Sequence, residues 1–124
     1  MKTIETKSAP AAIGPYSQAI LANGFLYTSG QIPLNPETGL IEGQTIEAQA
    51  EQAIKNLGEI LKAAGSDFSK VVKTTCFLAH ISDFAAFNAI YEEYFISKPA
   101  RSCFEVAALP KGALVEIEAV AVVE

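Results

Sequence analysis

The segment from Leu114 to Val123 constrains the fold more than any other part of the chain. Its residues alternate with the period of two that is typical of a β-strand. One face is wholly apolar and belongs in a core: Val115, Ile117, Ala119, Ala121 and Val123. The other face combines Leu114, Val120 and Val122 with Glu116 and Glu118. Because both faces carry apolar groups, the sheet that contains this strand needs cover on both sides.

Only two segments show helical periodicity. In the first, apolar residues recur every three or four positions between an N-cap at Thr45 and a left-handed cap at Gly65. The second is expected to start at the N-cap residue Ser82 and to bury an aromatic stripe: Phe84, Phe87, Tyr91, Tyr94 and Phe95. Two helices cover one face of a sheet but not both. We therefore expect a neighbouring subunit on the other face, and hence a homo-oligomer.

Four further strands are expected, at residues 16–22, 25–31, 71–79 and 101–108. Asn23-Gly24 joins the first two as a hairpin, because both residues accept a positive φ. Residues 101–108 and 114–123 are expected to form a final strand pair. No linker, repeat or low-complexity segment interrupts the chain. The sequence thus predicts a single domain over residues 1–124.

The composition argues against several classes of function. With a net charge of −5 and scattered lysines, the chain lacks the basic stripe that nucleic-acid binding requires. No apolar run approaches the ~18–20 residues that span a bilayer, and the N-terminus has no apolar targeting region, so we expect a soluble cytoplasmic protein. A single histidine, His80, and the absence of Cys-x-x-Cys spacing predict no metal site. Cys76 and Cys103 are expected to be free thiols.

Arg101 is the only arginine in the chain. A guanidinium is planar, stays charged and can bind a carboxylate or phosphate through two parallel hydrogen bonds. If its face of the strand lies beside Glu116 and Glu118, it could form an anion clamp next to a carboxylate that orients water. The alternative is an ordinary Arg–Glu ion pair. A clamp would leave N–H groups of Arg101 free, whereas an ion pair would saturate them.

Other candidate residues have equally plain alternatives. Cys103 could be a nucleophile favoured by the nearby guanidinium, or a small strand residue, since no histidine lies near it in sequence. Ser29-Gly30 could let a ligand approach the backbone at a strand end, or could mark a bulge. Asn88 lies beside the aromatic stripe of the second helix and could be a surface amide.

Seven short motifs occur in order along the chain. They are Ala12–Ala19 (AIGPYSQA), Thr28–Pro33 (TSGQIP), Val72–Thr75 (VKTT), Asn88–Tyr91 (NAIY), Pro99–Cys103 (PARSC), Leu109–Lys111 (LPK) and Glu116–Ala121 (EIEAVA). Together they resemble the RidA/YjgF family of reactive-intermediate deaminases over residues 3–123. The resemblance implies an α+β domain of chorismate-mutase-like shape, with a mixed sheet and two helices on one face, in a homotrimer with clefts between subunits.

The resemblance also implies an activity and a set of site residues. Members of the family hydrolyse 2-aminoacrylate, 2-iminobutanoate and 2-iminopropanoate, which pyridoxal-phosphate enzymes release, to 2-keto acids and ammonia without a cofactor or metal. By position, Arg101 would bind the substrate carboxylate and Glu116 would orient the attacking water. The remaining pocket residues would be Tyr16, Ser29, Gly30, Asn88 and Cys103.

Two departures and two alternatives accompany this interpretation. Residue 103 varies within the family, and Ala108 stands where many members carry arginine. A module that binds a 2-keto acid without turnover would need the same Arg101 pocket. An endoribonuclease or translation inhibitor fits poorly with one histidine, one arginine and a negative net charge. Glu118 could be structural or could assist Glu116.

Overall fold

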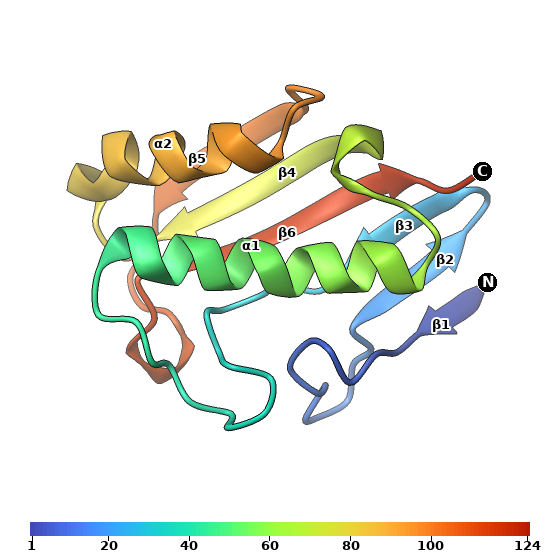
Figure 1. The fold of residues 1–124 in the computed structure, drawn as a ribbon, viewed down its shortest axis with the longest axis horizontal. Coiled ribbons are helices and arrows are strands. Elements are labelled where there is room, and N and C mark those ends of the chain that lie inside the picture. The colour runs from blue at the N-terminus through green and yellow to red at the C-terminus, as the bar shows by residue number, and fades with distance from the viewer.

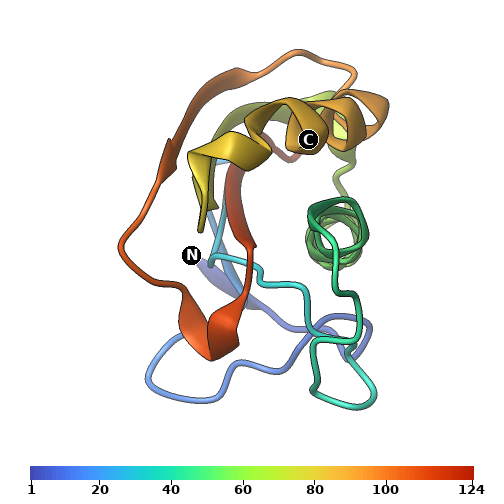
Figure 2. The ribbon, with the colours of Figure 1, turned by 90° about the vertical axis from the view of Figure 1, so that its left-hand side faces the viewer.

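The computed structural model covers residues 1–124 and contains one mixed six-stranded sheet with two helices (Figure 1). The strands are β1 (Lys2–Ile4), β2 (Ala19–Ala22), β3 (Phe25–Thr28), β4 (Val71–Leu78), β5 (Ala100–Glu105) and β6 (Val115–Val122). The helices are α1 (Ile46–Ala63) and α2 (Phe84–Tyr94). Seen along α1, both helices lie on the same side of the sheet (Figure 2). This arrangement confirms the expected α+β class with two helices on one face.

The strand order is β1-β2-β3-β6-β4-β5, and only β4 and β5 are parallel. The expected pairing of the last two strands is therefore wrong, because β4 lies between β5 and β6. Parallel neighbours need a long crossover connection, and α2 supplies it between β4 and β5. The short loop that follows β5 then carries the chain past the end of β4 into the middle of the sheet.

The hairpin between β2 and β3 forms where the sequence predicts it. Asn23 and Gly24 have φ angles of 53° and 80°, the positive values that a tight two-residue turn requires. Both strands are shorter than expected. Residues beyond them remain attached to the sheet individually, since the Ser29 amide donates to the Gln18 carbonyl at 2.8 Å and Gln31 forms an isolated bridge with Ile117.

The two helices match their predictions to different degrees. Thr45 caps α1 by accepting from the Ala48 amide at 3.1 Å, and Gly65 follows with a φ of 79°. In contrast, α2 begins at Phe84, because residues Ile81–Asp83 first form a 3₁₀ turn. Ser82 is exposed and does not act as the cap. No helix of the structure has the length and apolar character needed to span a bilayer.

The two faces of the sheet differ in cover. On the helix side, α1 and α2 bury alternate residues of the central strands, among them Leu26, Cys76 and Ile117, each 0% exposed. On the other side no helix is present (Figure 2), and Phe25, Tyr27 and Phe104 remain 39%, 49% and 44% exposed. The expected uncovered face with apolar groups is confirmed for the single chain.

Candidate functional site

Arg101 lies on the helix side of the sheet. In the parallel pair, Arg101 is the partner of Thr74 and Cys103 is the partner of Cys76. Paired residues point to the same face, and both Thr74 and Cys76 are fully buried beneath the helices. The expectation that Arg101 shares the open face with Glu116 is thus wrong. That expectation assumed that β5 pairs with β6. Instead β5 pairs with β4, and in this register Arg101 lies on the same face as the buried Thr74, toward α2.

The guanidinium of Arg101 is held by side chains of α2. Its Nη1 donates to Asn88 Oδ1 at 2.7 Å. Its Cζ lies 4.7 Å from the centre of the Tyr91 ring and 5.4 Å from that of Phe84. The chain contains a single ion pair, between Lys55 and Glu51, so no carboxylate lies within 4.0 Å of Arg101. The alternative of an ordinary Arg–Glu ion pair is therefore excluded within this chain.

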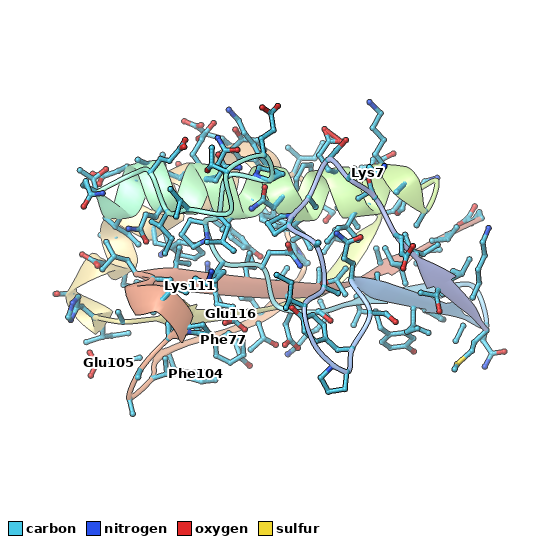
Figure 3. All side chains as sticks on the ribbon, turned by 90° about the horizontal axis from the view of Figure 1, so that it is seen from below. Lys7, Phe77, Phe104, Glu105, Lys111 and Glu116 are labelled. Atoms are coloured by element: carbon cyan, nitrogen blue, oxygen red, sulfur yellow. The ribbon has the colours of Figure 1, made fainter.

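Glu116 lies on the opposite face. It is the β6 partner of Phe77, which is in turn paired with Phe104, and all three lie on the side of the sheet away from α1 (Figure 3). The carboxylate rests against Gly30, where an added Cβ would overlap with Oε2. It forms no ion pair. Burial, and secondarily the charge of Glu118, raise the pKa of Glu116 above its usual range.

A cavity of about 540 Å³ adjoins this carboxylate. Its walls include Tyr16, Ser29, Gly30, Lys111 and Glu116. The Tyr16 side chain belongs to the long loop before β2, while Ser29 and Gly30 follow β3. Four of the predicted site residues are thus brought together on the open side of the sheet.

The remaining predicted residues lie elsewhere. Asn88 and Arg101 line a separate cavity of about 610 Å³, which shares no residue with the first. Cys103 is half-buried and lines neither cavity. A single copy of the chain therefore divides the predicted site into an arginine half and a carboxylate half, on opposite faces of the sheet.

Comparison with known proteins assigns the chain to a family. Residues 6–123 match the model of the family described as Endoribonuclease L-PSP, which is the RidA/YjgF family. The chain belongs to it. A human 2-iminobutanoate/2-iminopropanoate deaminase is 55% identical over 122 residues, covering 98% of this chain and 89% of that protein. A Lactococcus lactis protein named as a proposed regulator, AldR, is 58% identical and covers 100% of this chain and 99% of its own length.

A solved structure of the family gives the same fold. E. coli TdcF, crystallised with bound serine, has a TM-score of 0.94 at 41% identity and covers 100% of both chains. The resemblance inferred from seven short motifs is therefore confirmed at the level of family and fold.

In this RidA/YjgF chain the loop that carries Tyr16 is fixed by a residue that the sequence analysis missed. Gln18 is 3% exposed. Its side-chain nitrogen donates to the carbonyls of Thr6, Ala9 and Pro10, and its oxygen accepts from the Thr6 amide at 2.7 Å. One buried amide thus ties residues 6–10 to the start of β2. The sequence indicates this role only by placing the polar Gln18 immediately before an apolar strand.

The two thiols form a pair on the helix side. Both are free, and Cys76 is buried in the core as expected. The neighbouring Cys76 thiol, and then the charge of Arg101, lower the pKa of Cys103 to about 7, although burial opposes them. The same interaction with Cys103, together with burial, raises the pKa of Cys76. His80 is exposed and lines neither cavity, and no three histidine, cysteine or acidic side chains gather in a metal-binding group.

Proposed function

We propose that this protein hydrolyses short 2-imino acids and their enamine tautomers to 2-keto acids and ammonia. The observation that carries the proposal is the state of Arg101, which is held in place by α2 yet lacks a carboxylate partner. The human relative that shares 55% identity is named for this reaction. The carboxylate of a 2-imino acid would complete the hydrogen bonding of Arg101.

Arg101 and Glu116 would have separate roles. Arg101 would bind the substrate carboxylate and so fix the position of the neighbouring imine carbon. Glu116 would accept a proton from water as the water oxygen bonds to the carbon of the protonated imine and the C=N π electrons move to nitrogen, which gives a neutral carbinolamine. Glu116 would then return this proton to the amine nitrogen. As the C–N bond breaks and ammonia leaves, an oxygen lone pair would form the C=O bond and the hydroxyl proton would pass to solvent. A carboxylate with a raised pKa is a stronger base than an ordinary one.

This assignment requires a second copy of the chain. Since Arg101 and Glu116 face opposite sides of the sheet, the arginine half of one subunit would meet the carboxylate half of another in a cleft that Tyr16, Ser29, Gly30, Asn88 and Cys103 complete. The exposed Phe25, Tyr27 and Phe104 would be covered in such an assembly. We propose a homotrimer. Light scattering should then give three times the 13.2 kDa chain mass, and a monomer would refute the shared cleft.

The function is tested in a coupled reaction. A pyridoxal-phosphate threonine dehydratase releases an enamine that becomes 2-iminobutanoate, and the appearance of the keto acid is followed by absorbance. We expect the protein to accelerate this step. The acceleration by Arg101→Lys should be about 10²-fold smaller than that by the wild type, because an ammonium cannot replace the bidentate contact. Lys62→Ala, on the far side of α1, serves as the control. Equal rates for the wild type and Arg101→Lys would refute the role of Arg101.

A sensor of small carboxylates is the second candidate. It is favoured by the serine bound to TdcF and by the relative named as a proposed regulator. Saturable binding of 2-ketobutyrate with no acceleration of imine hydrolysis would support this alternative. Glu116→Gln separates the two, since it should retain binding and slow hydrolysis if the protein is an enzyme.

A further inference from the structure

Three residues of α2 meet the guanidinium of Arg101 from one face of the helix. Phe84, Asn88 and Tyr91 follow one another at steps of four and three residues, the spacing that aligns side chains along a helix. The sequence analysis assigned the two aromatic residues to the core stripe. In the structure Tyr91 belongs to the core, whereas the expected burial of Phe84 is wrong, since this side chain is 37% exposed. Both rings lie against the guanidinium, with Cζ 5.4 Å from the Phe84 centroid and 4.7 Å from the Tyr91 centroid.

The Tyr91 ring is a rigid support. It is 8% exposed and stacks on Phe95 with centroids 4.2 Å apart and planes at 21°. Its hydroxyl lies 2.8 Å from Thr74 Oγ1, and Thr74 is the strand partner of Arg101 itself. The ring beneath the guanidinium is thus anchored to the same position of the sheet from which Arg101 extends.

Asn88 holds the guanidinium without neutralising it. A guanidinium has five N–H donors, and Asn88 Oδ1 accepts from Nη1 at 2.7 Å. This is the one hydrogen bond that the Arg101 side chain makes within the chain. An amide oxygen carries no formal charge, so Arg101 keeps its full positive charge and its other donors for an anion. A carboxylate at position 88 would instead pair with the arginine and compete with any bound anion.

We propose that Phe84, Asn88 and Tyr91 form a cradle that fixes the Arg101 guanidinium in one orientation before ligand binds, so that these three are positioning residues for carboxylate recognition. The proposal rests on the carboxylate-binding role proposed for Arg101. It also reassigns Asn88, which was expected to line the pocket against substrate: here Asn88 acts on the substrate through Arg101. Fixing the guanidinium in advance reduces the entropy lost on binding.

The only arginine of the chain permits a direct test by nuclear magnetic resonance. Protein labelled with [¹⁵N]arginine gives a single side-chain Nε–Hε signal, which reports Arg101 alone. In the wild type we expect this signal to be displaced by the ring currents of the two aromatics and to show slow rotation of the guanidinium. Asn88→Ala and Phe84→Leu should move it toward the position of free arginine and speed the rotation. Glu93→Ala, an exposed change on α2, should leave it in place.

Binding and turnover complete the experiment. Asn88→Ala should weaken 2-ketobutyrate binding and raise KM for the imine roughly 10-fold, with kcat nearly unchanged. Asn88→Asp should keep the guanidinium ordered yet weaken binding at least as much, because the new charge pairs with Arg101. Asn88→Gln should recover part of the binding. Tyr91→Phe keeps the ring and should retain most of the displacement of the signal.

The possible failures are distinguishable. An Arg101 signal that is unchanged in Asn88→Ala and Phe84→Leu would refute the cradle. A fall in kcat for Asn88→Ala with unchanged binding would place Asn88 at the reacting atoms and also overturn the proposal. If 2-ketobutyrate left the Arg101 signal of the wild type unchanged, the carboxylate role of Arg101 would fail and the positioning role with it. If 2-ketobutyrate bound and the Arg101 signal showed an ordered guanidinium, but no imine were hydrolysed, the cradle would stand and only the proposed hydrolysis would be contradicted.

Discussion

Arg101 and Glu116 are the two charged groups of the proposed site, and the chain holds them in different ways. On the helix side, Arg101 is supported by three side chains of α2 and donates to Asn88. On the open side, Glu116 rests against the backbone of Gly30 and borders a cavity lined by Tyr16, Ser29 and Lys111. The orientation of Arg101 is determined within one subunit, whereas the surroundings of Glu116 depend on what covers the open face.

The difference separates two tasks that a site must perform. Recognition of a carboxylate requires a fixed geometry, which a helix packed on a sheet can supply. General-base chemistry requires a group whose pKa responds to its surroundings, and a half-buried carboxylate beside a second acid meets that need. Changes on the open side should therefore alter rate and pH dependence more than ligand binding.

The largest effect on the open side is expected for Gly30→Ala. The φ of Gly30 is not positive, so alanine fits the backbone, but its methyl group would displace the Glu116 carboxylate. We expect kcat to fall by about 10²-fold with little change in KM, since a shift of about 1 Å at a reacting group has this cost. In the background of Glu116→Gln the same change should add little. Additive losses in that double mutant would contradict action through Glu116.

A smaller effect concerns pH. If hydrolysis requires ionised Glu116, activity is present above the raised pKa of this residue and is lost as the pH falls through it. Glu118→Gln removes the neighbouring negative charge, so the pKa of Glu116 should fall and the acid limb of the rate profile should move to lower pH. The measurement is kcat/KM against pH for both proteins, corrected for uncatalysed hydrolysis. An acid limb that Glu118→Gln moves to higher pH would be inconsistent with the assignment.

The smallest effect is expected on the helix side and requires no turnover. The rate of Cys103 alkylation by iodoacetamide should rise with pH around a midpoint of about 7. Cys76→Val removes the neighbouring thiol that lowers the pKa of Cys103, so the midpoint should move to higher pH. Cys76 is fully buried and should not react in the folded protein, and Cys103→Ser provides the blank. An unchanged midpoint in Cys76→Val would show that the buried thiol does not influence Cys103.

Local elements were predictable from the sequence because their causes are local. Asn23-Gly24 determines a tight turn through its own backbone preferences, and Thr45 and Gly65 mark the two ends of α1. Alternation also grouped Arg101 with Cys103 on one face of β5 correctly. In these cases the deciding interactions lie within a few residues of one another.

Long-range pairing was not predictable in the same way. Alternation states which residues share a face of one strand, but it does not state which strand is the neighbour. The order of β4, β5 and β6 depends on the crossover through α2, and it alone decides that Arg101 meets Asn88 and not Glu116. The role of Gln18 was missed for a similar reason, since its partners in residues 6–10 come together only in the folded chain.

The central place of β6 has a consequence for how the protein is made. Although it is the last strand along the chain, β6 pairs with both β3 and β4. Until residues 115–122 have left the ribosome, β3 and β4 each present an unpaired edge. The core beneath the helices also lacks the buried side chains of β6 until then. The pairs β1-β2-β3 and β4-β5 can therefore join into one sheet only after β6 has emerged, and until then the nascent chain must keep two unpaired strand edges from pairing with the wrong partner.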